Sequence, residues 1–251
     1  MLSATALKGL PEVAPGDDLA RMIAASASAA PGPLAPGDAL VVAHKVISKA
    51  EGRIRVLSEV IPGERARSLA RAHAKDPRIV QVVLDESSEL LRASHGVLIC
   101  ATPHGFVCAN AGVDSSNAPR PETVVLLPRD PDGSARSLRR RLRELTGVAP
   151  AVLITDSFGR AWRHGQCDVA IGCAGLSALD DWRGRHDAFG RELRATWIAV
   201  ADQLAAAADL ARRKDALEPV MLVRGVGAHV SLDDGPGAAV LLRPKGEDLF
   251  R

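Results

Sequence analysis

The chain has 251 residues, of which 47% are hydrophobic and 25% charged, and this ordinary globular balance excludes a disordered chain, a collagen or a coiled coil. A net charge of +2 gives no general electrostatic reason to bind nucleic acid or a membrane surface. Aromatic residues make up only 3%, which argues against a stacking platform for single-stranded nucleic acid. We therefore expect neither a nucleic-acid partner nor a membrane partner.

The cysteines and the N-terminus indicate the compartment. Cys100, Cys108, Cys167 and Cys173 form no CxxC pair, which favours reduced thiols over a disulfide framework or a structural zinc site. The N-terminus lacks a basic leader followed by an apolar run, and no window approaches the roughly 18 apolar residues of a membrane span. These features predict a cytoplasmic protein.

Hydrophobic periodicity and turn residues predict alternating helices and strands. In chain order we expect a helix over 17–30, a strand over 38–42 that continues with polar residues over 44–48, a helix over 64–73, strands over 79–84, 97–100, 106–111 and 124–127, a helix over 134–145, a strand over 152–155, a helix over 192–211, and strands over 219–223 and 240–242. The strands 97–100 and 106–111 are expected to pair as a hairpin. Asp17 or Asp18 is the predicted cap of the first helix, and Ser134 that of the third.

This order of elements predicts a mixed α/β or α+β fold. The sequence has no GxxxxGK[ST] loop and no strand-linked GxGxxG, so a P-loop or Rossmann fold is disfavoured. No repeat or long linker forces a boundary, and we expect a single domain over residues 1–251, with a division into two subdomains left open.

Three segments rich in Gly, Asp, Asn, Ser and basic residues follow apolar strands, at 45–53, 110–117 and 155–168. Polar residues at strand ends are where α/β sheets build sites. Asp114 and Asp156 have hydroxyl neighbours, and carboxylate and hydroxyl oxygens suit Mg²⁺ or Mn²⁺. The alternative is that both are turn or capping aspartates.

Five basic residues lie in or near the same segments: Lys45, Lys49, Arg53, Arg160 and Arg163. Lysine and arginine beside carboxylates suit phosphoryl transfer, in which catalysis is mainly positioning and charge neutralisation. Surface ion pairing is the alternative for each of them singly. The arginine run at 139–141 is interpreted as a solvated helix face.

Taken together, Gly9–Glu12 (GLPE), VISKAEGR, ANAGVDSSN, LLPRDPDGSA, ITDSFGRAWRHGQ, AIGCAGL and the final DLFR resemble the coenzyme F420-0:L-glutamate ligase family. The resemblance extends from about residue 9 to residue 251. It implies a mixed α/β fold particular to that family, and a homodimer. A second, flavin-binding domain follows the ligase domain in many relatives, and we expect none in this chain.

The resemblance also implies the activity. It points to a GTP-dependent ligase that adds L-glutamate to the side-chain carboxyl of the deazaflavin precursor F420-0, through an acyl phosphate, and then adds further γ-linked glutamates. GTP is the co-substrate. The implied metal cofactors are two divalent ions, Mg²⁺ or Mn²⁺. Whether K⁺ also binds is left open.

Carried over residue by residue, the resemblance implies two sets of ligands. The residues implied to bind GTP are Leu10, Pro11, Glu12, Val13, His44, Lys49 and Asn117. His44 stands where the family more often has a small hydroxyl or an amide, but a neutral imidazole can still donate one hydrogen bond. The residues implied to hold metal are Asp114, Asp156 and Ser157. The base for the glutamate amine is unassigned; Glu51 is one candidate, with a structural ion pair as the preferred alternative.

Two alternatives remain open. One is a GTP-dependent amide ligase that acts on a different carboxylate. The other is a GTP- and metal-binding sensor that has kept the site without turnover.

Overall fold

The computed structural model describes residues 1–29, 32–213 and 215–248, and its centre is a five-stranded sheet. In spatial order the strands are β1 (Ser3–Ala6), β12 (Val220–Arg224), β2 (Ala39–Ala43), β8 (Ala151–Arg160) and β9 (Arg163–Ala174). β2 and β8 are parallel, and the other neighbours are antiparallel. The carboxyl ends of β2 and β8 therefore lie at the same edge of the sheet.

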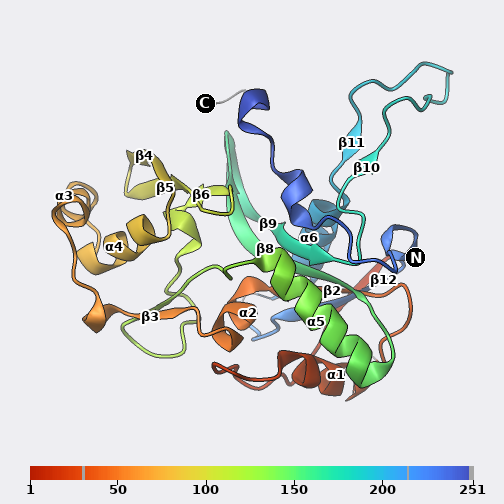
Figure 1. Cartoon of the computed structure of the whole chain (residues 1–251), viewed down its shortest axis with the longest axis horizontal. Helices are drawn as coiled ribbons and strands as arrows, with labels where there is room; N and C mark the ends of the chain where they lie inside the picture. Colours follow the sequence, from red (N-terminus) through yellow and green to blue (C-terminus); the bar gives the residue numbers. More distant parts are fainter. Residues whose placement is uncertain (30–31, 214, 249–251) are drawn as a thin grey trace.

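Helices cover both faces of this sheet (Figure 1). Leu40 and Val42 of β2 pack in one core with α1 (Leu19–Ala29) and α5 (Pro131–Thr146). Ala39 and Val41 pack on the other side with α6 (Val200–Ala211). This alternation is the two-residue period of a strand that is buried on both faces.

A lobe with its own core lies beside the sheet, at the left of Figure 1. Its elements are β3 (Ile54–Val56), α3 (Glu64–His73), α4 (Pro77–Asp85), β4 (Glu89–Ser94), β5 (Val97–Ala101), β6 (Val107–Ala109) and β7 (Thr123–Val125). β4, β5 and β6 form an antiparallel sheet, and β3 pairs with β7. The expected hairpin over 97–111 is confirmed, as is the helix over 64–73.

The remaining elements are short. α2 (His44–Ala50) follows β2 directly, and β10 (Asp180–Asp181) and β11 (Trp197–Ile198) pair at the base of a projecting arm. Single turns of 3₁₀ helix span Leu57–Glu59, Asn110–Gly112, Gly227–His229, Ala238–Leu241 and Lys245–Glu247. No helix in the described part of the chain combines the length and apolar character that crossing a bilayer requires.

Three predicted elements are wrong, and a fourth begins later than predicted. Residues 79–84 form helix α4, because Asp76 caps the helix by accepting from the Arg78 N–H, and Pro77 follows at the first helical position. Residues 44–48 are helical, residues 240–242 lie in or just after a 3₁₀ turn, and the helix predicted from 192 begins at Val200. A short apolar run does not separate a strand from a buried helix turn.

Two details of the helices also differ from expectation. Asp130, not Ser134, caps α5, through a 2.9 Å hydrogen bond from the Gly133 N–H. Arg139 in the arginine run is buried, with its guanidinium bonded to Asp234 Oδ1 at 2.6 Å and to backbone carbonyls, so that position is no solvated face. Asp18 does cap α1, by accepting from the Arg21 N–H. Residue 30 of the first predicted helix and the last three residues of DLFR lie outside the described residues.

The mixed α/β class is confirmed, with neither a P-loop nor a Rossmann arrangement.

Candidate functional site

The site begins where β2 and β8 end together. Ala43 pairs with Thr155 in the parallel register, so His44 and Asp156 are the next residues at the same edge. His44 Nε2 lies 3.3 Å from Asp156 Oδ1. His44 is buried, its Nδ1 lies 3.4 Å from Ser48 Oγ, and its Nε2 makes no hydrogen bond within the described residues. Two strand ends thus bring together two residues that are 112 positions apart in the sequence.

Lys45 joins this edge to the lobe. Its Nζ lies 2.6 Å from Asp114 Oδ2 and 2.6 Å from Ser116 Oγ. Asp114 is held in place by backbone bonds in both directions with Val125 of β7 and by the Ser116 N–H, which donates to Oδ1 at 2.7 Å. The three polar segments thus meet at this edge through Lys45, Asp114 and Asp156.

The electrostatics favour two ionised carboxylates here. Burial raises the pKa of Asp156, but the nearby His44 imidazole, the Lys45 ammonium group and the Ser157 N–H, which donates to Oδ1, together lower it by more. Burial likewise raises the pKa of Asp114, and the hydrogen bonds of Lys45 and Ser116 outweigh it. The pKa values of both aspartates lie below the ordinary value, and the Lys45 ammonium group contributes to lowering each of them.

The Ser157 side chain is hydrogen-bonded to a buried ion pair that was not predicted from the sequence. Its hydroxyl donates to Asp168 Oδ1 at 2.5 Å, and the Thr155 hydroxyl donates to Oδ2 at 3.0 Å. Arg212 Nη1, from the residue after α6, lies 3.0 Å from the same Oδ2. Asp168 and Arg212 are nearly inaccessible, with side chains 2% and 9% exposed. In the sequence, the one sign of this ion pair is the aspartate itself, on the strand that pairs with β8. Its arginine partner lies 44 residues further along the chain.

The residues expected to bind GTP form a second group along α2. Lys49 Nζ lies 2.5 Å from Glu12 Oε1, and the loop is also held by the Gly16 N–H, which donates to the Ala50 carbonyl at 2.8 Å. Lys49 is buried, whereas the side chain of Glu12 is 65% exposed. Within the same loop Leu10 is half-buried, Pro11 is exposed and Val13 is buried.

Some expected residues lie apart from this cluster. Asn117 is exposed in the loop after Asp114, with a left-handed φ of 55°. Arg53 pairs with Glu86 at 2.6 Å and donates to the Leu127 carbonyl, which makes it a structural residue of the lobe. Arg160 and Arg163 lie at the exposed far end of the β8–β9 hairpin.

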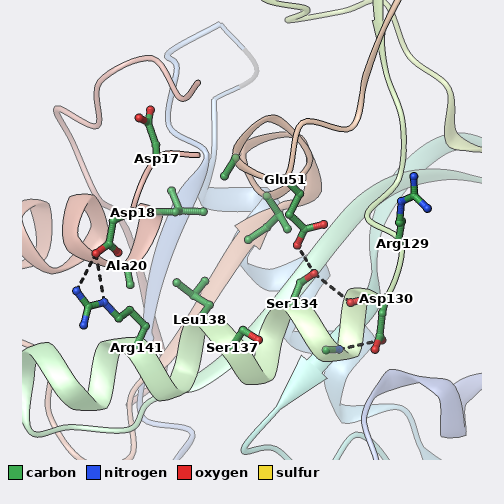
Figure 2. A pocket seen from close by; sticks show the side chains of 14 residues that line it. Asp17, Asp18, Ala20, Glu51, Arg129, Asp130, Ser134, Ser137, Leu138 and Arg141 are labelled. Atoms are coloured by element: carbon green, nitrogen blue, oxygen red, sulfur yellow. Dashed lines mark hydrogen bonds and ion pairs between the residues drawn. The ribbon is translucent and has the colours of Figure 1, made fainter. Parts of the chain in front are cut away.

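The other side of α2 faces a cavity of about 490 Å³ between α1, α2 and α5. Figure 2 shows its polar side chains, and most of them already serve the fold: Arg141 pairs with Asp18, Asp130 caps α5, and Ser134 donates to Glu51. Ile47, Ala50 and Leu138 supply an apolar lining. Glu51 thus lies on the cavity side and is engaged with Ser134.

Over the described residues, no group of three or more His, Cys, Asp and Glu side chains is placed to hold a metal ion. Asp114 and Asp156 provide two carboxylates, so an ion between them would need hydroxyl, water or phosphate oxygens as its other ligands. Cys108 is buried nearby, and burial together with Asp156 raises the pKa of its thiol to about 12, so it is an unreactive core residue.

The chain is similar in sequence to known proteins over most of its length. The profile of a family described as F420-0:Gamma-glutamyl ligase matches residues 9–225. The chain is 47% identical over 242 residues to a "Coenzyme F420:L-glutamate ligase" of Methanopyrus kandleri, covering 96% of this chain and 94% of that protein. It is 43% identical over 251 residues to the protein of the same name from Methanothermobacter thermautotrophicus, covering 100% and 99%. A third, from Methanocaldococcus jannaschii, is 43% identical over 220 residues, covering 87% and 86%.

Proposed function

The chain belongs to the F420-0:gamma-glutamyl ligase family, and from that membership we propose that it joins L-glutamate to F420-0 in a reaction driven by GTP. The coarser function, a ligase that adds glutamate to F420, follows from the family and its named relatives. We propose in addition that the reaction depends on GTP, that it passes through an acyl phosphate, and that the enzyme adds further γ-linked glutamates.

The observation that carries the proposal is the meeting of Lys45, Asp114 and Asp156 at one edge of the sheet. Transfer of a phosphoryl group from GTP to a substrate carboxylate brings several negative charges together. Lys45 and the buried Lys49 offer positive charge on consecutive turns of α2, one turn apart. We propose that they hold phosphate and carboxylate oxygens, with Lys49 on the nucleotide.

The donor set also fits a hard divalent cation. Asp114 and Asp156 are carboxylates with lowered pKa values, and Ser157, the next residue after Asp156 on β8, carries a hydroxyl oxygen. We propose that these three residues hold Mg²⁺ or Mn²⁺, as two ions, with K⁺ as a further candidate. A divalent ion there would neutralise charge that develops on phosphate oxygens.

In the proposed reaction, the carboxylate of F420-0 attacks the γ-phosphate of GTP and GDP leaves. The amine of L-glutamate then attacks the acyl carbon of the resulting acyl phosphate, an amide bond forms, and phosphate leaves with the bonding electron pair. The role of the chain is to position these groups and balance their charge. His44, with an unused buried Nε2 beside Asp156, and the loop of Leu10, Pro11, Glu12 and Val13 with Asn117 are proposed to contact GTP.

We further propose a homodimer in the cytoplasm, as the family resemblance implies. Dilution to nanomolar concentration tests this part, because mass photometry reports the dimer directly. A monomer that keeps full ligase activity at that dilution would remove any functional role for the dimer.

The experiment for the proposal as a whole is mass spectrometry of F420-0 incubated with the protein, GTP, Mn²⁺ and L-glutamate. We expect the mass of F420-0 to rise by whole glutamate residues, with GDP and phosphate released only when both acceptor and glutamate are present. Binding of GTP without any gain in mass would favour a sensor, and glutamate transfer to another carboxylate alone would favour a different amide ligase.

A further inference from the structure

The far end of the β8–β9 hairpin projects beyond the packed sheet. Residues 151–155 of β8 are buried, whereas residues 159–166, which include the turn, are all exposed. Arg160 is the last residue of β8 that pairs, opposite Arg163, so Ala161 and Trp162 form the turn. The site residues Asp156 and Ser157 stand at the base of this projecting end.

Trp162 is the second residue of the turn. Its side chain is 80% exposed, so it contributes little to the core. Its φ of 58° lies in the left-handed region, which an aromatic side chain disfavours and glycine adopts freely. A large aromatic residue held in strained backbone and presented to solvent points to a binding role.

The same end of the hairpin is positively charged. Between Phe158 and Cys167 the chain carries Arg160, Arg163 and His164 and no acidic residue. Arg160 Nη2 donates to the His164 carbonyl at 2.6 Å, which fixes its guanidinium across the turn. Neither arginine forms an ion pair within residues that the structure describes, so their charge is available for an anion.

The projecting arm around β10 and β11 provides a contrast. There Arg183 stacks on Trp197 at 4.1 Å, but it also pairs with Asp181 at 2.7 Å. Arg185 lies 4.9 Å from Trp182 and 3.5 Å from Asp180. Arg183 and Arg185 are thus each balanced by a carboxylate of the same arm, unlike Arg160 and Arg163 at the end of the β8–β9 hairpin.

We propose that the hairpin end, residues 159–165, binds the deazaflavin acceptor, with Trp162 stacked on the ring system and Arg160 and Arg163 paired with its anionic side chain. This inference rests on the proposed function and adds the residues that select the acceptor. The seven residues from Asp156 to Trp162 span at most about 20 Å in extended chain. The ring and the reacting carboxyl of one acceptor can then lie along a single strand, with the carboxyl at the Asp156 end.

The test is binding of F420-0, followed by its intrinsic deazaflavin fluorescence, to the full chain and to Trp162→Ala. Stacking of an aromatic ring is worth about 1–3 kcal/mol, so we expect the Kd for F420-0 to rise by about tenfold, and its KM likewise. GTP affinity and the mass of the protein in solution should stay unchanged, and Trp162→Phe should restore most of the binding. Phe189→Ala is the matched control, because Phe189 is 90% exposed at the other projecting arm and should leave F420-0 binding unaffected.

Equal affinity of wild type and Trp162→Ala for F420-0 would overturn the inference. A fall in molecular mass in Trp162→Ala without a change in F420-0 affinity would show that the hairpin end contacts a second copy of the chain instead. If the wild type elongates F420-0 and the variant does so equally well, only this inference fails. If the wild type neither binds nor elongates F420-0, the proposed function fails with it.

Discussion

The two sides of α2 differ in what they offer a ligand: one carries charged side chains beside carboxylates, and the other lines a cavity. One side presents His44, Lys45 and Lys49 to carboxylates from β8, the lobe and the N-terminal loop. The other side lines the cavity of about 490 Å³, where most polar groups cap helices or pair with one another (Figure 2). A cavity offers room for a ligand, whereas lysines beside carboxylates with lowered pKa values offer groups that can take part in a reaction. In this molecule the two properties lie on opposite sides of one short helix.

The largest effect should come from Asp156→Asn, which removes the more buried carboxylate of the charged side. We expect ligase activity to fall by about 10³-fold, because charge stabilisation by a bound divalent ion is worth several kcal/mol. The fold should survive, since an asparagine oxygen can still accept from the Ser157 N–H. Steady-state kinetics at limiting Mn²⁺ provide the measurement.

The control for Asp156→Asn lies on the cavity side. Glu51→Gln keeps an acceptor for the Ser134 hydroxyl, and its activity should remain near that of the wild type. Undiminished turnover in Asp156→Asn, or a comparable loss in Glu51→Gln, would remove the distinction between the two sides.

The next effect concerns stability beneath the charged side. Arg212→Met leaves Asp168 buried without its ion-pair partner, and breaking a buried pair from one side costs about 3–5 kcal/mol. For a chain of this size the melting temperature should fall by about 6 °C or more. Adding Asp168→Asn should recover part of the loss. Calorimetry measures the melting temperature of each variant. The control is Arg183→Met, which breaks the exposed pair with Asp181 and should change the melting temperature little. Equal losses in Arg212→Met and Arg183→Met would contradict the prediction.

A smaller effect is expected from Lys49→Ala. A hydrogen bond to a charged group is worth about 1.5–3 kcal/mol, so GTP affinity should weaken by about tenfold or more. Because Lys49 is buried beside Glu12, the variant also needs a stability control, and Glu12→Gln separates loss of the ion pair from loss of phosphate binding. Unchanged GTP affinity by calorimetry would exclude Lys49 from the nucleotide site.

The smallest effect tests a carboxylate away from both sides of α2. Burial raises the pKa of Asp202 on α6, against a weaker lowering by the Ala170 N–H. A raised pKa means that the folded state binds the proton more tightly, so stability falls as pH rises from the unfolded pKa of about 3.9 through the folded value. Asp202→Asn should therefore melt roughly 1–2 °C higher at pH 7 and show no gain below pH of about 3.5. A lower melting temperature of Asp202→Asn than of the wild type at pH 7 would contradict this prediction.

Part of the site could be predicted from the sequence because it depends on local order. Asp156 follows a buried apolar run, and parallel neighbours end at the same edge, so its meeting with residues after β2 follows from the fold class. Asp114 was expected there from its hydroxyl neighbours, and its link to Lys45 supports that expectation. The roles of these residues toward GTP and metal stay predictions.

Other features depend on tertiary contacts that no local pattern encodes. The pairing of Asp168 with Arg212 joins a strand to the end of a helix, and nothing in either segment names the partner. Burial of Lys49 depends on the N-terminal loop folding over α2. Helix α4 could have been predicted from the sequence, because Asp76 and Pro77 are typical of a helix start. The apolar run that follows them was interpreted as a strand instead.

The most direct test of the central claim is anomalous diffraction from Mn²⁺ in crystals of the full chain grown with GTP. We expect manganese peaks between the carboxylates of Asp114 and Asp156, with the nucleotide phosphates toward Lys49. Manganese bound instead in the cavity beside Glu51 and Asp130, with no peak at Asp114 and Asp156, would contradict it.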